Sequence, residues 1–207
     1  MTSRRPLLPA IAAVVLAACG GGGGTSPAAG GSAAARSNAA ASVAGITARA
    51  LLEPALAEAR AWQPDAELVA VSTSFAAGPR HTFWFYDVQS PSRKSCTRIR
   101  VLENGTIENV GTGGACVLMK PLSGDFIDSP EAWRAARAAG FVPGDSVQFA
   151  LRYQRDAALP ATQECWLLWS DAEGDAAAGV IRGWCVDPAS GQFVARLAGK
   201  GRSTPAQ

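Results

Sequence analysis

The chain has 207 residues, of which 48% are hydrophobic and 17% are charged, and its formal net charge is +2. No run of Lys and Arg stands out, which argues against a nucleic-acid-binding protein, because such a protein concentrates basic side chains on one surface. The low net charge and the lack of a basic run also argue against electrostatic binding to a membrane surface.

The first residues have the pattern of an export signal. A short basic segment with Arg4 and Arg5 precedes an apolar run from Pro6 to Ala18. This run is too short to span a bilayer, which needs about 20 apolar residues, and it has the layout of a cleaved secretory signal. We therefore expect a signal peptide over residues 1–18.

The end of this segment, Leu16-Ala17-Ala18-Cys19, resembles the lipobox of bacterial lipoprotein signal peptides. Those peptides are cut before a cysteine that then carries the lipid. The resemblance implies acylation of Cys19, with palmitate among the acyl chains, and a lipid bilayer as partner. Gly20 stands where Asp would indicate retention in the inner membrane, so the resemblance implies the outer membrane, facing the periplasm. The alternative is an ordinary signal peptide in which Cys19 is incidental.

A low-complexity segment follows the lipobox. Residues 19–42 are mostly Gly, Ala and Ser, which cannot bury enough apolar surface to offset the entropy of ordering. We expect a disordered tether there and a flexible tail over residues 199–207.

Loss of Arg4 and Arg5 with the signal would lower the 19 basic residues to 17, equal to the 17 acidic residues.

The remaining chain follows one pattern twice, which predicts two related α+β halves over residues 43–122 and 123–198. The alternative is a coincidence that any α+β chain could produce. In the first half, Pro54 predicts a kink in an Ala- and Leu-rich helix. The expected elements are a helix over Thr47–Trp62, strands over Glu67–Phe75, His81–Val88 and Cys96–Leu102, and a hairpin at Asn104-Gly105 leading into Thr106–Val110.

The second half begins at Ser129, a favourable N-cap for a helix that Gly140 would end. The expected strands are Ser146–Gln154, Glu164–Ser170, Gly179–Val186 and Gln192–Leu197. Together the two halves predict an α+β fold, an antiparallel sheet with one helix from each half on one face.

Two segments resemble PepSY-type domains, small exported modules in which a helix packs on an antiparallel sheet. Asp187-Pro-Ala-Ser-Gly-Gln-Phe-Val is similar to their last hairpin, and Ala55–Ala59 followed by Leu68–Val71 is similar to their helix and first strand. The resemblance implies binding or inhibition of peptidases and transfers no functional residue. Pro54 and the cysteines depart from the family pattern.

Four cysteines remain after Cys19, and an even number in an exported chain implies disulfides. Of the three possible pairings we predict Cys96–Cys116 and Cys165–Cys185, since each pair lies within one half. The rival interpretation is a metal site. It is disfavoured because C-x-x-C spacing is missing and His81 is the single histidine. We therefore expect neither a metal nor a cofactor.

Catalysis finds little support in the sequence. His81 is the one imidazole available for acid–base chemistry, no G-x-S-x-G elbow occurs, and the cysteines are expected in disulfides. We predict a protein that is not an enzyme. The alternative is a small envelope hydrolase that uses His81 with a nearby carboxylate.

The aromatic stretch from His81 to Tyr86 is the strongest indication of function. Strand alternation places Phe83 and Phe85 on one face and Trp84 and Tyr86 on the other. One face can pack under a helix, and the other must be covered by the second half of the chain, by a partner or by a ligand. Trp166 raises the same question for the second half. Trp84, Tyr86 and Trp166 are therefore the candidate binding surface, although both faces could be buried within the chain.

These observations predict a membrane-anchored periplasmic lipoprotein, without catalytic activity, that binds a protein or peptide at the cell envelope. The contact surface would be an aromatic face or a sheet edge. A purely structural envelope lipoprotein is the further alternative.

Overall fold

The computed structural model describes residues 45–175, 180–197 and 200–201. The lipobox and the tether over residues 19–42 lie outside the described residues. Of the expected tail, Lys200–Gly201 are described and form a short strand. No helix in the described part of the chain is long and apolar enough to cross a bilayer.

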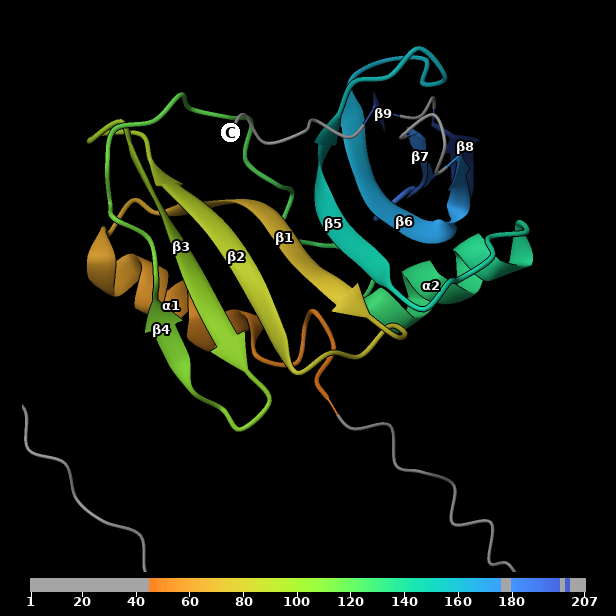
Figure 1. Ribbon diagram of the computed structural model, residues 1–207. Coiled ribbons are helices and arrows are strands. Elements are labelled where there is room, and N and C mark those ends of the chain that lie inside the picture. The colour runs from red at the N-terminus through yellow and green to blue at the C-terminus, as the bar shows by residue number, and fades with distance from the viewer. Residues whose placement is uncertain (1–44, 176–179, 198–199, 202–207) are drawn as a thin grey trace, which may run out of the picture. The chain divides into compact units, whose positions relative to one another are not determined.

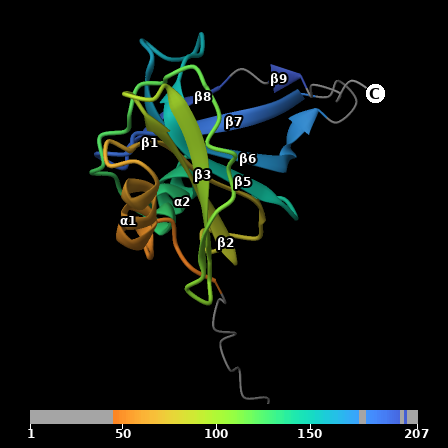
Figure 2. The same ribbon diagram turned by 90° about the vertical axis from the view of Figure 1, so that its left-hand side faces the viewer.

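The fold is α+β, as the sequence predicts, with two helices and an antiparallel sheet in the strand order β4-β3-β2-β1-β5-β6-β7-β8 and β9 paired with β7. Both helices lie on one face of the sheet (Figures 1 and 2), which we call the helix face, and the opposite face is the open face. The elements are α1 (Leu52–Trp62), β1 (Glu67–Ala76), β2 (Phe83–Ser90), β3 (Ser95–Leu102), β4 (Ile107–Asn109), α2 (Ser129–Ala138), β5 (Val147–Gln154), β6 (Gln163–Asp175), β7 (Val180–Val186), β8 (Phe193–Arg196) and β9 (Lys200–Gly201).

The pair β1 and β5 joins the two halves of the sheet. These strands run antiparallel, with Val71 opposite Leu151 and Thr73 opposite Phe149. Outward from this pair, each half adds its own strands in chain order, β2 to β4 on one side and β6 to β8 on the other. The halves therefore share one continuous sheet.

Large aromatic side chains fill the core between the sheet and the helices. The rings of Trp84 on β2 and Trp166 on β6 meet edge to face with centroids 6.3 Å apart. Each indole also donates a hydrogen bond to the segment before a helix, Trp84 Nε1 to the Ile46 carbonyl and Trp166 Nε1 to the Ile127 carbonyl, both at 2.9 Å. The same two side chains thus fill the core and position the entry to each helix.

The helix boundaries differ in part from the sequence-based expectation. Residues 48–51 form turns, and α1 begins at Leu52. Pro54 then lies in the first turn, where a backbone N–H has no intrahelical partner, so the expected kink has no cause. Helix α2 does begin at Ser129, but its N-cap is Asp128, whose carboxylate accepts a hydrogen bond from Ser129 N at 2.7 Å.

Two disulfides join Cys96 to Cys116 and Cys165 to Cys185, the pairing expected from the sequence. Cys165 and Cys185 lie on neighbouring strands with Cα atoms 5.2 Å apart. Because the register places Leu167 opposite Cys185, the two cysteines are diagonal neighbours on the open face. Together with Leu159 and Leu197 they form a small buried cluster, which closes this part of the open face.

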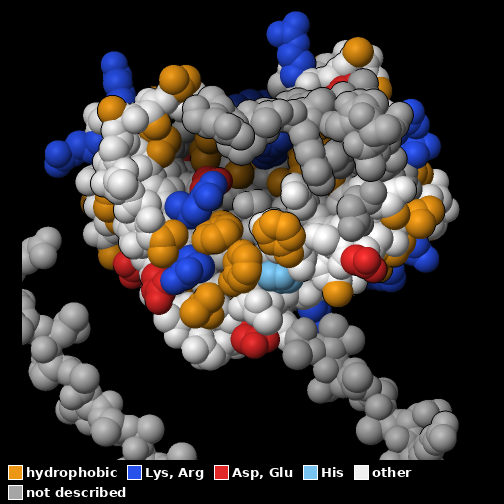
Figure 3. Space-filling model, in the orientation of Figure 1, with side chains coloured by type: hydrophobic (Ala, Val, Ile, Leu, Met, Phe, Trp, Pro, Cys, Tyr) orange, Lys and Arg blue, Asp and Glu red, His pale blue; other side chains and the backbone are white. Residues whose placement is uncertain are grey.

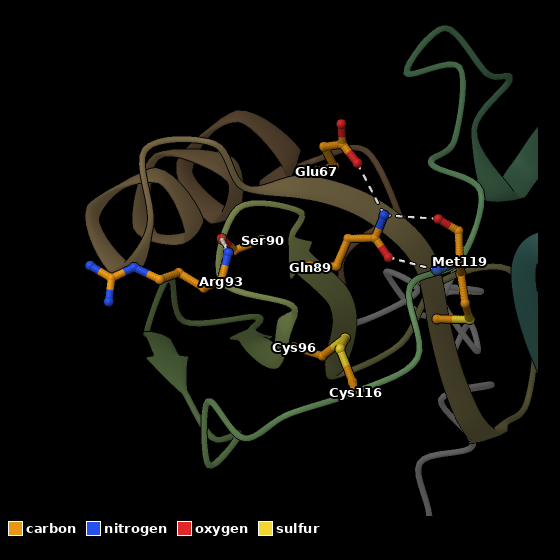
Figure 4. Close-up of a disulfide and its surroundings, with 7 residues drawn as sticks. All are labelled: Glu67, Gln89, Ser90, Arg93, Cys96, Cys116 and Met119. Carbon is orange, nitrogen blue, oxygen red and sulfur yellow. Dashed lines mark hydrogen bonds between the residues drawn. A yellow bond between two sulfur atoms is a disulfide. The ribbon is translucent and has the colours of Figure 1, made fainter.

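The other disulfide fastens the segment that follows β4 (Figure 4). Cys96 on β3 and Cys116 have Cα atoms 5.7 Å apart. Nearby, the Gln89 side chain donates to the Met119 carbonyl and accepts from the Met119 N–H, both at 2.8 Å. The disulfide and these two hydrogen bonds hold Met119, and with it Lys120, beside the sheet.

Both disulfides close loops with a sequence separation of 20, so the loop-entropy model assigns them the same stabilisation, about 3 kcal/mol. Replacing Cys165 and Cys185 by Ala also removes buried sulfur atoms from the small cluster. We therefore expect urea unfolding to show a larger loss of stability for this double variant than for the matched Cys96→Ala/Cys116→Ala variant. An equal or smaller loss would contradict the packing described for the cluster.

Candidate functional site

The side chains predicted to form the binding surface belong to the core instead. Trp84, Tyr86 and Trp166 are each 0% exposed, so this prediction is wrong. The alternation was assigned correctly, but the helices cover the face that carries these residues. Burial raises the pKa of Tyr86, and its hydroxyl donates a hydrogen bond to the Ala48 carbonyl at 2.8 Å.

A row of partly exposed rings, His81 just before β2 and Phe83 and Phe85 on the opposite side of β2, forms what we call the aromatic row. The centroid of Phe83 lies 4.6 Å from that of His81 and 5.1 Å from that of Phe85. Figure 3 shows the open face, with the single histidine in pale blue among orange hydrophobic side chains and with basic side chains nearby. The row is therefore a continuous apolar strip that solvent reaches.

An arginine ends the aromatic row. The Arg98 guanidinium carbon lies 5.0 Å from the centroid of the Phe85 ring. Its Nε and Nη2 donate to the two carboxylate oxygens of Asp87, at 2.5 and 2.9 Å. These hydrogen bonds raise the pKa of Arg98, and the guanidinium charge lies directly against the charge of the carboxylate.

A hollow of about 760 Å³, which we call the cationic hollow, continues from Asp87 across β1 and β5. It contains three basic side chains, and none of them takes part in an ion pair among the described residues. Its single acidic residue, Asp87, is already paired with Arg98. The hollow is therefore positively charged; its lining is Val69, Ala70, Asp87, Met119, Lys120, Arg152, Tyr153, Gln154, Arg155 and Thr162.

Arg152 has the most defined environment of the three cations. Its guanidinium carbon lies 5.7 Å from the centroid of the Trp169 ring. Its Nε is buried and has no hydrogen-bond partner in the described part of the chain.

Phe75 combines two unfavourable features near the end of β1. Its side chain is 76% exposed, and its φ of 62° lies in the left-handed region, which a bulky residue rarely adopts. It lies where the β1–β5 register shifts, between Thr73 and Ala76. Such strain persists where the surrounding structure imposes it and concentrates at functional sites.

The described hydrogen-bond partners of His81 are a threonine hydroxyl and the backbone of Phe83. Its Nδ1 lies 3.0 Å from Thr73 Oγ1 and 3.4 Å from Phe83 N. No acidic side chain is hydrogen-bonded to the ring among the residues that the structure describes. These residues also contain no group of three His, Cys, Asp or Glu side chains that could hold a metal ion.

No family model and no curated protein match the chain. Among solved structures, it is similar to a candidate lipoprotein from Clostridium difficile 630, with 12% sequence identity and a TM-score of 0.42. The alignment covers 70% of this chain and 90% of that chain.

Phe75 offers a direct test of the strained position. Phe75→Asn should raise the free energy of unfolding by about 1 kcal/mol, because Asn adopts a left-handed backbone more readily. The matched control is Val117→Asn at another exposed apolar position, 88% exposed and outside the positive-φ residues, where the change should be near zero. Urea unfolding measures both, and a stability loss for Phe75→Asn would show that the ring stabilises the fold.

Proposed function

We propose that this protein is a lipid-anchored envelope protein that binds a protein or peptide on the open face of its sheet, without catalysis. The observation that carries the proposal is the aromatic row, which leads through Arg98 to the cationic hollow. Aromatic and arginine side chains dominate the binding energy of protein interfaces. The exposed, strained Phe75 adds a large apolar contact near the same strands.

The proposed location depends on the sequence before the described residues. The lipobox at Cys19 and the Gly-rich tether support an acylated protein held beside a bilayer, and Gly20 supports the outer membrane facing the periplasm. Several acyl chains are needed for a stable anchor, because one chain binds only marginally.

A single substitution tests the anchor. Cys19→Ser should abolish incorporation of an alkyne analogue of palmitate and move the chain from the membrane fraction to the soluble fraction. Cys165→Ala/Cys185→Ala is the control, since it removes cysteines without touching the lipobox, and it should remain labelled. Unchanged labelling of the Cys19→Ser variant would rule out this anchor.

We also propose that the two halves are repeats, similar to tandem PepSY-type domains. The support is the matched pair of indole hydrogen bonds, Trp84 to the segment before α1 and Trp166 to the segment before α2. The equivalent strands in each half occupy equivalent places relative to the β1–β5 pair.

Site-specific photocrosslinking tests binding at the open face. A photoreactive phenylalanine analogue at Phe85 should give discrete crosslinked products in cells that express the full chain. The same analogue at Ala57, an exposed position on α1, should give none of these products. Introducing Phe75→Asn beside the Phe85 probe should reduce their yield.

Two outcomes would contradict the proposal. One is the absence of crosslinks from Phe85 while the variant is folded and correctly located. The other is an identical set of products from Phe85 and Ala57, which would indicate random collisions in the envelope.

A further inference from the structure

We propose that the cationic hollow recognises acidic side chains of an extended peptide, whose apolar side chains lie on the aromatic row. This inference rests on the proposed binding function and specifies the chemistry of the partner. It concerns Lys120, Arg152 and Arg155, for which neither the sequence pattern nor the predicted binding surface gave a role.

The described lining of the cationic hollow carries a net positive charge. Asp87 is the one carboxylate in the described lining. Arg98 donates two hydrogen bonds to it, so the guanidinium charge compensates the charge of this carboxylate. Lys120 Nζ lies 4.4 Å from the centroid of the Tyr153 ring, and Arg152 lies against Trp169, so two of the cations rest on aromatic faces. The three cations therefore present uncompensated positive charge to a concave surface, which attracts a ligand with more than one negative charge.

The guanidinium of Arg152 can bind a carboxylate. An arginine binds a carboxylate through two parallel N–H donors, and Arg98 does this with Asp87 on the neighbouring part of the open face. Arg152 has the same fork, held against Trp169, with its buried Nε lacking an acceptor. Because Nε is buried, a ligand carboxylate would pair with the two terminal nitrogens, Nη1 and Nη2, of this partly exposed side chain.

The aromatic row and the cationic hollow together form a long site. His81, Phe83, Phe85 and Asp87 are alternate residues along one extended segment, and Asp87 lines the hollow. At about 3.3 Å per residue, the distance from His81 to Asp87 is roughly 20 Å. A single phosphate or carboxylate fills only one end of such a site, whereas an extended peptide reaches both the apolar row and the hollow. This favours an acidic peptide over an anionic lipid headgroup.

Binding of defined peptide pools to the purified, immobilised full-length protein tests the inference. Each pool contains random peptides with a fixed Phe flanked by two Glu, two Gln or two Lys. The Glu pool should be retained about tenfold more than the Gln pool, and the Lys pool should be retained least. Arg152→Gln should remove the preference for Glu, and added salt should weaken it.

Arg60→Gln is the matched control, because Arg60 is an exposed residue of α1 on the helix face, and it should retain the preference. Circular dichroism shows whether each variant is folded, and Lys120→Gln replaces Arg152→Gln if the latter does not fold. Equal retention of the three pools by the parent protein would overturn the inference. So would Arg152-dependent binding to phosphatidylglycerol vesicles, relative to phosphatidylcholine, without a preference for Glu peptides.

The outcomes separate this inference from the proposed function. Loss of the Glu preference with crosslinking from Phe85 intact would overturn the acidic ligand and leave binding at the open face standing. Loss of both would overturn both proposals.

Discussion

In the described part of the chain, two short helices cover only one face of a nine-stranded sheet, and the other side of every strand has to be accommodated without them. Strand alternation sends side chains to both faces, so every strand that buries a residue under the helices also presents one on the opposite side. Trp84 and Trp166 meet on the covered face and position the segments before both helices. The open face must then be closed by other means or left to solvent.

The two halves of the sheet treat the open face differently. In the second half, Leu159 and Leu197 enclose the Cys165–Cys185 disulfide in a small buried cluster. In the first half, the Cys96–Cys116 disulfide fastens the segment that carries Lys120, and it is not part of such a buried cluster. The aromatic row remains in contact with solvent and borders the cationic hollow. The first half of the sheet therefore keeps a solvent-exposed surface, the aromatic row with the adjoining hollow, on the open face.

Local pattern in the sequence predicts most of the elements and the cysteine pairing, because periodicity, turn residues and spacing are local signals. It does not predict which side of β2 the helices cover, since alternation treats Trp84 and Phe85 alike. The hollow also escapes prediction, because it brings together Lys120 and Arg152 from segments far apart in the chain. The left-handed backbone of Phe75 coincides with a register shift between β1 and β5, which depends on both strands and is not visible in the sequence of either one.

Hydroxyl-radical footprinting of the purified full-length protein shows whether the aromatic row faces solvent while the helix face is sealed. The account predicts rapid oxidation of Phe83 and Phe85 and strong protection of Trp84 and Trp166, although tryptophan is intrinsically the more reactive side chain. Protection of Phe83 and Phe85 to the same degree as Trp84 would contradict the account, because the open face would then be covered by the protein itself.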